Sequence, residues 1–296
     1  MTIKNVTVAG SGVLGSQIAF QTAFKGFNVT VYDINEEAIN KAKDRIKGLR
    51  HSYKQDIAAT DEDFEKGLAN ISYSWDLAKA VSNADLVIEA IPERPDIKKD
   101  FYKKLAKLAP KEAIFTSNSS TLIPSMFMED TGRPAQFLNM HFANQVWLNN
   151  TAEIMGSPKT DPDIYKETVQ FARNIGMIPI QLKKEQPGYI LNSMLIPLLN
   201  AAQYLWADGV ADPQMIDKTW VAATGAPFGP FSIIDIIGVR TDYNITLEEA
   251  KSNPKLEPAV KKLKEMLDEG KLGKEAGEGF YKYPNPAYKQ KDFLKI

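Results

Sequence analysis

Hydrophobic and polar positions alternate in blocks through the first half of the chain. Short apolar runs rich in valine and isoleucine predict buried strands over residues 3–9, 29–32, 86–91 and 113–116. Between them, helical spacing of apolar residues predicts helices over residues 13–25, 35–54 and 98–108. Nearly continuous apolar strands that alternate with helices are typical of a parallel sheet covered on both faces. We therefore expect an α/β fold in this half of the chain.

The pattern changes near Gln186-Pro187-Gly188. Beyond this point the spacing predicts only helices, over residues 189–206, 213–224 and 256–267. We place a domain boundary here, which gives an N-terminal domain over residues 1–186 and a smaller all-α domain over residues 187–296, expected to contribute to the substrate cleft and to dimer contacts. The helix at 189–206 is apolar on nearly every face, so it must be covered within its domain or by a second subunit. We expect a homodimer.

A glycine-rich turn follows the first predicted strand and opens the first predicted helix. It reads Gly10-Ser11-Gly12-Val13-Leu14-Gly15, the pattern G-x-G-x-x-G. In this context Gly10 permits the tight turn, Gly12 lets the backbone approach a pyrophosphate, and Gly15 lets the helix pack closely on the strand. The pyrophosphate would lie at the helix N-terminus. The turn therefore predicts a Rossmann domain with a mostly parallel sheet, whose cofactor contacts are Gly10, Gly12, Val13, Leu14 and Gly15.

Asp33 ends the second predicted strand, 18 residues after Gly15. A carboxylate there can accept hydrogen bonds from the adenosine ribose and would repel a 2′-phosphate. No arginine follows at residues 34–36 to offset that repulsion, so NAD is favoured over NADP. FAD, whose fingerprint is similar, and a glycine turn that binds nothing are the alternatives.

Composition excludes several other classes of site. The chain has 296 residues, a formal charge of −1 and no cysteine, so thiolate metal sites and cysteine nucleophiles are ruled out. With only two histidines, we expect no metal site. The near-neutral charge argues against nucleic acid as a partner. The N-terminus does not resemble a signal peptide, and the apolar run over residues 189–206 contains asparagine and proline. We expect a cytoplasmic protein that does not bind membranes.

Hydride transfer between nicotinamide and a carbonyl also needs a group that gives or takes the hydroxyl proton, and histidine is the usual choice. His51 lies in a charged helical stretch and is expected to be exposed. His141 follows the apolar run Phe137-Leu138-Asn139-Met140, near the end of the predicted Rossmann domain, where strand ends line the cofactor crevice. His141 is therefore the candidate acid/base, although a histidine at a strand end is often structural.

At this point the chain resembles the 3-hydroxyacyl-CoA dehydrogenase family. The matching segments occur in family order and cover almost the whole chain: residues 10–15, Asp85-Leu86-Val87-Ile88-Glu89-Ala90-Ile91-Pro92-Glu93, Ser117-Asn118-Ser119-Ser120, His141-Phe142-Ala143-Asn144, Pro187-Gly188-Tyr189-Ile190-Leu191-Asn192, Gly229-Pro230-Phe231, and Gly277-Glu278-Gly279-Phe280-Tyr281. The resemblance implies an NAD-dependent oxidoreductase that acts on the L-(S) alcohol.

The resemblance also implies catalytic roles. His141 would be the acid/base and Glu153 the carboxylate that orients it, while Ser120 and Asn192 would hydrogen-bond the substrate oxygen. Each side chain also has a structural interpretation. Ser120 could cap a following helix, Asn192 could satisfy a buried helix, and Glu153 could lie in a solvated turn.

Three further residues match family positions that contact the nicotinamide half of the cofactor: Glu93, Lys98 and Asn144. Lys98 has an alternative interpretation, because it stands among other lysines on what could be a solvated helix face.

The sequence departs from the usual family pattern in three places. The histidine motif reads His141-Phe142-Ala143-Asn144-Gln145 rather than His-Phe-Phe-Asn-Pro, and resembles the diketoreductase branch, which reduces β-keto and 3,5-diketo esters. Leu49 and Asp56 stand where a serine and a lysine that contact CoA are expected. Nearby Lys47, Arg50 and Lys54 could replace them. Lys274-Glu275 stands where many members have two basic residues.

These observations favour NAD-dependent interconversion of short-chain 3-hydroxyacyl-CoA and 3-ketoacyl-CoA. Two alternatives stay open: the same chemistry on a non-CoA β-keto ester or small 3-hydroxy acid, and a non-catalytic dinucleotide-binding protein.

Overall fold

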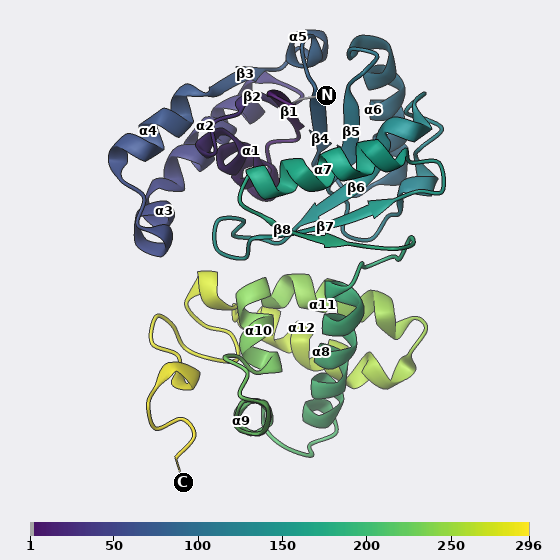
Figure 1. The fold of residues 1–296 in the computed structure, drawn as a ribbon. Coiled ribbons are helices and arrows are strands. Elements are labelled where there is room, and N and C mark those ends of the chain that lie inside the picture. Colours follow the sequence, from purple (N-terminus) through teal and green to yellow (C-terminus); the bar gives the residue numbers. More distant parts are fainter. Residues whose placement is uncertain (1–2, 296) are drawn as a thin grey trace. The chain divides into compact units, whose positions relative to one another are not determined.

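The computed structural model describes residues 3–295, and the chain divides into two compact units, Met1–Ile190 and Leu191–Ile296. The first unit holds one eight-stranded sheet in the order β3-β2-β1-β4-β5-β6-β7-β8 (Figure 1). Its strands are β1 (Asn5–Ala9), β2 (Asn28–Tyr32), β3 (Ile71–Ser74), β4 (Leu86–Glu89), β5 (Ile114–Ser117), β6 (Phe137–Phe142), β7 (Thr151–Gly156) and β8 (Ile178–Gln181). Neighbouring strands are parallel except β6 and β7, which are antiparallel.

Helices cover both faces of this sheet. They are α1 (Val13–Phe24), α2 (Glu36–Gly48), α3 (Arg50–Ile57), α4 (Asp61–Ala69), α5 (Leu77–Val81), α6 (Pro95–Leu108) and α7 (Pro162–Asn174). Side chains alternate across the strands, so that Ile88 of β4 belongs to the core cluster that includes residues of α1, α2, α4 and α7, whereas Val87 belongs to the cluster that includes residues of α5 and α6. The predicted α/β fold, with its mostly parallel sheet, is confirmed.

The structure differs from the sequence prediction in detail. The helix predicted over residues 35–54 is two helices, α2 and α3, which meet at Gly48 and Leu49. Glycine is a poor helix former and permits the break. Strands β3, β7 and β8 were not predicted, and the strand predicted to end before His141 continues through Phe142.

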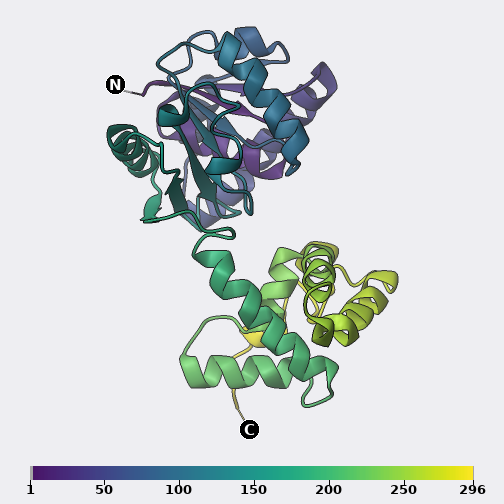
Figure 2. The ribbon, with the colours of Figure 1, turned by 90° about the vertical axis from the view of Figure 1, so that its right-hand side faces the viewer.

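The second unit consists of helices and connecting loops (Figure 2, green to yellow). The helices are α8 (Leu191–Ala207), α9 (Pro213–Thr224), α10 (Pro230–Ile237), α11 (Val239–Ala250) and α12 (Glu257–Asp268). Their core includes Leu199, Phe231 and Leu263. The predicted helix at 189–206 begins only at Leu191, because Tyr189 has a left-handed backbone with φ 54° that cannot continue a helix.

Two buried aspartates explain the glycine motifs of the second unit. Asp217 accepts hydrogen bonds from the N–H groups of the first turn of α10 and from the hydroxyl of Tyr281, and a Cβ at Gly229 would lie 2.4 Å from its Cγ. Asp235 accepts from the N–H of Tyr281, and a Cβ at Gly279 would lie 2.0 Å from its Oδ1. These motifs therefore have structural roles.

Helix α8 is incompletely covered. It buries Leu199, Ala202 and Gln203, whereas Met194 and Leu205 remain exposed. Within the described residues, no helix has the length and hydrophobicity that a membrane span would require.

Candidate active site

The glycine-rich turn lies between β1 and α1. Gly10 has φ 95°, and a Cβ there would lie 2.4 Å from the carbonyl oxygen of Ala90 in the neighbouring strand connection. A Cβ at Gly15 would lie 2.0 Å from the Gly10 carbonyl oxygen, so both positions require glycine. A Cβ at Gly12 would meet no described atom within 4 Å. No described side chain caps the first turn of α1, which leaves its N–H groups and the space at Gly12 for an anion.

Asp33 stands directly after β2 and is tied to the same turn. Its Oδ2 accepts hydrogen bonds from the Ser11 N–H at 2.8 Å and the Ser11 hydroxyl at 2.5 Å. A surface pocket beside it is lined by Gly12, Asp33, Lys41 and Arg45 among others. Arg45 also donates to the Ser11 carbonyl oxygen at 3.1 Å. Although residues 34–36 include no arginine, Lys41 and Arg45 of α2 give this pocket positive charge.

His141 and Glu153 are paired across two antiparallel strands. They are direct register partners on β6 and β7, and His141 Nδ1 lies 3.1 Å from Glu153 Oε2. Both side chains are buried. His141 was expected just after its strand, but it lies inside β6, and this placement is what sets it opposite Glu153. The interpretation of Glu153 as a carboxylate in a solvated turn is wrong.

The last two residues of the first unit hold both members of this pair. The ring of Tyr189 stacks on the His141 imidazole, with centroids 4.7 Å apart and an interplanar angle of 22°. The N–H of Ile190 donates to Glu153 Oε1 at 2.9 Å. With Nδ1 facing Glu153, the other ring nitrogen, Nε2, is the one that can exchange a proton with a substrate oxygen.

The segment after His141 reaches α1. The Phe142 N–H donates to Asn118 Oδ1 at 3.0 Å, and the Gln145 N–H donates to the side chain of Gln17, on α1, at 2.7 Å. The histidine segment and the glycine turn therefore belong to the same edge of the sheet, where the carboxyl ends of parallel strands meet.

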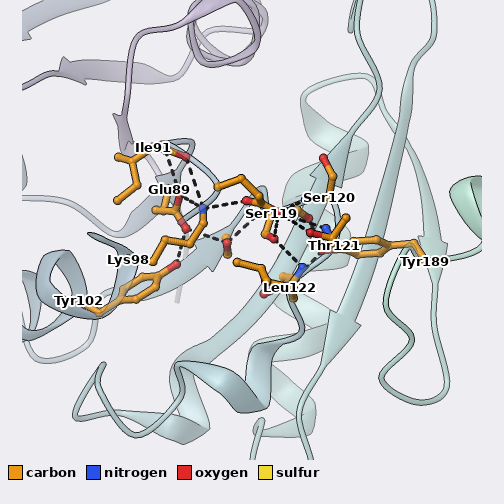
Figure 3. Close-up of polar contacts among 12 residues, drawn as sticks. Glu89, Ile91, Lys98, Tyr102, Ser119, Ser120, Thr121, Leu122 and Tyr189 are labelled. Atoms are coloured by element: carbon orange, nitrogen blue, oxygen red, sulfur yellow. Dashed lines mark hydrogen bonds and ion pairs between the residues drawn. The ribbon is translucent and has the colours of Figure 1, made fainter. Parts of the chain in front are cut away.

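A buried cluster surrounds Lys98 (Figure 3). Only 1% of its side chain is exposed, so the interpretation as a solvated helix face is wrong. Its Nζ donates to Oε1 of the fully buried Glu89, at the end of β4, at 2.5 Å. Glu89 Oε2 accepts from the hydroxyls of Tyr102 and Ser117, each at 2.7 Å. Burial, together with the charge of Glu89, raises the pKa of Tyr102 well above its usual value, so the phenol stays a donor.

Glu93 organises the loop that contains Ser120. Its Oε1 accepts hydrogen bonds from the Ser119 hydroxyl, from the Ser120 N–H at 3.0 Å and from the Thr121 N–H at 3.1 Å. Burial raises the pKa of Glu93, but the Ser119 hydrogen bond and the charge of Lys98 lower it more, and the net shift is downward. Glu93 is thus held as a carboxylate.

Ser120 does not cap a helix, since it is the hydroxyl of Ser119 that accepts the N–H of Leu122, at 2.9 Å. Asn144 is exposed in the connection between β6 and β7 and offers its side chain at the surface. Asn192 lies in the first turn of α8, in the second unit. The first unit thus groups His141 with Glu153, and separately Ser120 with Glu93 and Lys98.

The connection over residues 143–150 is fixed to α3. Trp147 Nε1 donates to Asp56 Oδ2 at 2.9 Å, and the indole packs on Tyr53. Asp56, one of the departures from the family pattern, thus has a structural partner. Two of the neighbouring cations also have partners, because Arg50 pairs with Asp61 and Glu65, and Lys54 pairs with Asp61 at 2.8 Å. His51 is exposed, as expected.

Sequence reasoning did not single out Glu89, Ser11, Arg45 or Tyr189. Glu89 could have been found as a carboxylate that ends an otherwise apolar strand, and Arg45 by its place on the helix after Asp33. The side-chain contacts of Tyr189 with Ser119, Asn139 and His141 come from residues distant in the sequence.

Comparison with known proteins gives a consistent result over nearly the whole chain. Residues 5–186 match the model of the 3-hydroxyacyl-CoA dehydrogenase NAD binding domain, and residues 188–283 match that of the 3-hydroxyacyl-CoA dehydrogenase C-terminal domain. The chain is 36% identical over 289 residues to the mitochondrial hydroxyacyl-coenzyme A dehydrogenase of Sus scrofa, covering 95% of this chain and 91% of the pig protein. It is 34% identical to a probable 3-hydroxybutyryl-CoA dehydrogenase of Deinococcus radiodurans, over 93% of this chain and 99% of that protein.

Two solved structures of similar proteins support the same family assignment. A diketoreductase described in terms of substrate-directed dual catalysis of dicarbonyl compounds is 57% identical, with a TM-score of 0.92 over 96% of this chain and 100% of that one. The (S)-3-hydroxybutyryl-CoA dehydrogenase of Ralstonia eutropha is 28% identical, with a TM-score of 0.82 over 96% and 100% of the two chains.

Proposed function

This chain belongs to the 3-hydroxyacyl-CoA dehydrogenase family, and we propose that it uses NAD to interconvert 3-hydroxyacyl and 3-ketoacyl groups with His141 as the acid/base. The observation that carries the proposal is the buried pair of His141 and Glu153, 3.1 Å apart, in a chain with an NAD-binding domain. A carboxylate that fixes one imidazole nitrogen leaves the other to exchange protons with a hydroxyl or carbonyl oxygen.

The N-terminal unit fits NAD. The open space at Gly12 and the uncapped start of α1 suit a pyrophosphate, and Asp33 is held by Ser11 where a ribose would be bound. When bound, NAD accepts a hydride from the 3-hydroxy carbon, and NADH returns it to the 3-keto carbon.

We propose that side chains of the protein transfer the proton to and from the substrate oxygen. In the reduction direction we propose that the His141 imidazolium gives the proton on Nε2 to the substrate oxygen, while the Nδ1 proton stays on the Glu153 side. In the oxidation direction Nε2 takes the hydroxyl proton. Glu153 fixes the tautomer of the imidazole by its hydrogen bond. Ser120 and Asn192 are proposed to donate hydrogen bonds to the same oxygen, where negative charge develops.

A second candidate substrate class is a β-keto ester or other dicarbonyl compound without CoA. Two observations favour it. The 57% identical solved structure is a diketoreductase. In addition, Arg50 and Lys54 already have carboxylate partners, which they would have to exchange for a CoA phosphate. We propose the hydride and proton chemistry for both classes.

A direct comparison of substrates tests the proposal. NADH oxidation would be followed by the loss of the absorbance of reduced nicotinamide, with acetoacetyl-CoA and with ethyl acetoacetate as substrates. Turnover of either substrate supports the proposed reaction class. The ratio of kcat/KM for acetoacetyl-CoA to kcat/KM for ethyl acetoacetate shows whether the enzyme prefers the CoA thioester or the ester. If neither 3-keto substrate is reduced at any pH between about 5 and 9, a range that brackets histidine titration, the proposal is wrong and the non-catalytic alternative gains support.

We further propose that Asn144 contacts the nicotinamide half of the cofactor. We also propose that the protein forms a homodimer and that it is located in the cytoplasm. The exposed apolar side chains of α8 support the homodimer, because a second copy of the chain would bury them.

A further inference from the structure

We propose that Tyr189 is a positioning residue for this reaction, which holds the His141 imidazole and the Ser119–Ser120 loop in one fixed arrangement. The inference rests on the proposed function, because Tyr189 would act through His141 and would touch neither the substrate nor the cofactor. Its ring, its hydroxyl and its backbone each contribute a separate observation.

The ring of Tyr189 fixes the plane of the imidazole. The hydrogen bond from Nδ1 to Glu153 holds one ring atom, but the last torsion of a histidine side chain is broad and allows the ring to rotate. Tyr189 is fully buried and stacks on the imidazole at 4.7 Å and 22°. Rotation of the imidazole would collide with that face, so the direction of Nε2 is set by Glu153 and Tyr189 together.

The hydroxyl of Tyr189 connects two other parts of the site. It donates to the carbonyl oxygen of Ser119 at 2.7 Å and accepts from the side-chain amide of Asn139 at 2.9 Å (Figure 3). Asn139 is two residues before His141 on β6, and it also donates to the Leu122 carbonyl at 2.8 Å. Burial raises the pKa of Tyr189, which keeps the phenol protonated and able to donate. One side chain therefore ties the loop that contains Ser120 to the strand that contains His141.

The backbone of Tyr189 is held in an unfavourable conformation. It has φ 54°, a left-handed value that residues other than glycine rarely adopt. This conformation directs the Tyr189 ring to His141 and the next N–H, of Ile190, to Glu153 Oε1 at 2.9 Å. Residues in such conformations persist where many contacts determine them, often at functional sites.

The ordinary interpretation is that Tyr189 only fills space in the core. A space-filling residue would be replaced by leucine or phenylalanine with loss of stability but with no effect that depends on His141. A double-mutant cycle separates the two interpretations, because residues that act as a unit have non-additive effects on turnover.

The experiment compares kcat and KM of wild type, Tyr189→Leu, Tyr189→Phe, His141→Ala and the double variant Tyr189→Leu/His141→Ala. The reaction is NADH-dependent reduction of whichever of acetoacetyl-CoA and ethyl acetoacetate wild type prefers. Rates are divided by the concentration of NADH-binding sites from fluorescence titration, so that unfolded protein does not contribute. Matched controls are Tyr53→Phe, which removes another buried hydroxyl, and Phe64→Leu, which removes another buried ring.

We expect Tyr189→Leu to lower kcat by about 30-fold, since a small displacement of a catalytic group costs up to about 100-fold. Tyr189→Phe keeps the ring and should lose about fivefold, the effect of one hydrogen bond. NADH affinity and KM should change by less than about threefold, and both controls should keep wild-type kcat, because none of these side chains is expected to bind either ligand. In the His141→Ala background, Tyr189→Leu should have almost no further effect on kcat.

Two results would overturn the inference while leaving the proposed function intact. One is a Tyr189→Leu enzyme with wild-type kcat per binding site. The other is an equal loss of kcat with and without His141, which would show that Tyr189 does not act through the imidazole. If wild type reduces neither substrate, both the proposed function and this inference fall.

Discussion

The two nitrogens of the His141 ring have different tasks in the proposed reaction. Nδ1 faces Glu153 at 3.1 Å, and Nε2 is the position at which a proton can be given or taken. Both side chains are buried, so the hydrogen bond between them is shielded from water.

Replacement of His141 tests this assignment. We expect His141→Ala to lower kcat by about 1,000-fold, within the range typical for loss of a general acid/base. NADH affinity should stay nearly unchanged, because the cofactor is expected to bind at the glycine turn. Steady-state kinetics and fluorescence titration measure the two quantities. His51→Ala, at the exposed histidine, is the control. A parallel loss of turnover and NADH binding would instead indicate that His141 has a structural role.

Asp33 is expected to set the choice of cofactor. Its carboxylate would repel the 2′-phosphate of NADPH, whereas Lys41 and Arg45 line the same pocket. We expect Asp33→Ala to weaken NADH binding and to lower the NADH/NADPH ratio of kcat/KM by at least about tenfold, since like charges in contact cost several kcal/mol. Unchanged cofactor preference would contradict the role given to Asp33. Glu37→Ala, on the rim of the pocket, is the matched control.

At the scale of single residues, local sequence patterns predicted the residues of the cofactor site better than those of the catalytic site. Gly10 and Asp33 were predictable because a turn and a strand end are marked by neighbouring residues. Glu153 came only through family resemblance. Its partnership with His141 depends on the antiparallel pairing of two strands, and the second of these was not predicted.

At the scale of elements, β1, β4 and β5 were predicted because they are apolar runs that are buried on both faces, whereas β2 was predicted from its β-branched residues and is buried on only one face. Two of the missed strands, β3 and β8, are not buried in this way. Strand β3 reads Ile71-Ser72-Tyr73-Ser74, and β8 contains Pro179, which a sheet accepts here because β8 is an edge strand. Tertiary pairing rather than local pattern makes these segments strands.

A buried carboxylate between α8 and α11 makes the stability of the second unit depend on pH. Asp242 is buried, and one of its oxygens has no hydrogen-bond partner among the described residues; the other accepts from Gln203 at 3.4 Å. Burial raises the pKa of Asp242 to about 7. The folded state therefore holds the proton more tightly than the unfolded state, and the free energy of unfolding falls as pH rises from about 4 to about 7.

Asp242→Asn should remove this dependence. Between pH 5 and pH 8 we expect wild type to lose about 2 kcal/mol more unfolding free energy than the variant. Urea denaturation at the two pH values measures it. Asp208→Asn, at an exposed aspartate of the same unit, should behave like wild type. If wild type and Asp242→Asn respond equally to pH, the carboxyl is not protonated in the folded protein at pH 5.

At the scale of the whole molecule, the change from strands to helices near residue 186 was visible in the sequence, and the chain divides into compact units at Ile190 and Leu191. The number of chains in the assembly was inferred only from the apolar character of one helix. Met194 is 64% exposed on α8, which leaves apolar surface for a partner.

We expect a dimer of twice the 33.0 kDa chain, about 66 kDa, by light scattering at micromolar concentration. Met194→Glu should shift the mass toward the monomer, because a charge buried at an interface without a partner is costly. Lys261→Glu, on the polar surface of α12, is the control. A wild-type mass of one chain would contradict the expectation.

The pairing of β6 with β7 has a consequence for how such enzymes diversify. Main-chain hydrogen bonds set His141 opposite Glu153, and a slip of one residue would turn the carboxylate to the other side of the sheet. The eight residues 143–150 that join the two strands take no part in that ladder, and they include Ala143 and Gln145, where this sequence leaves its family's usual motif. Substitutions in the connection can therefore adapt the protein to a new substrate while the ladder keeps the proposed acid/base pair in place.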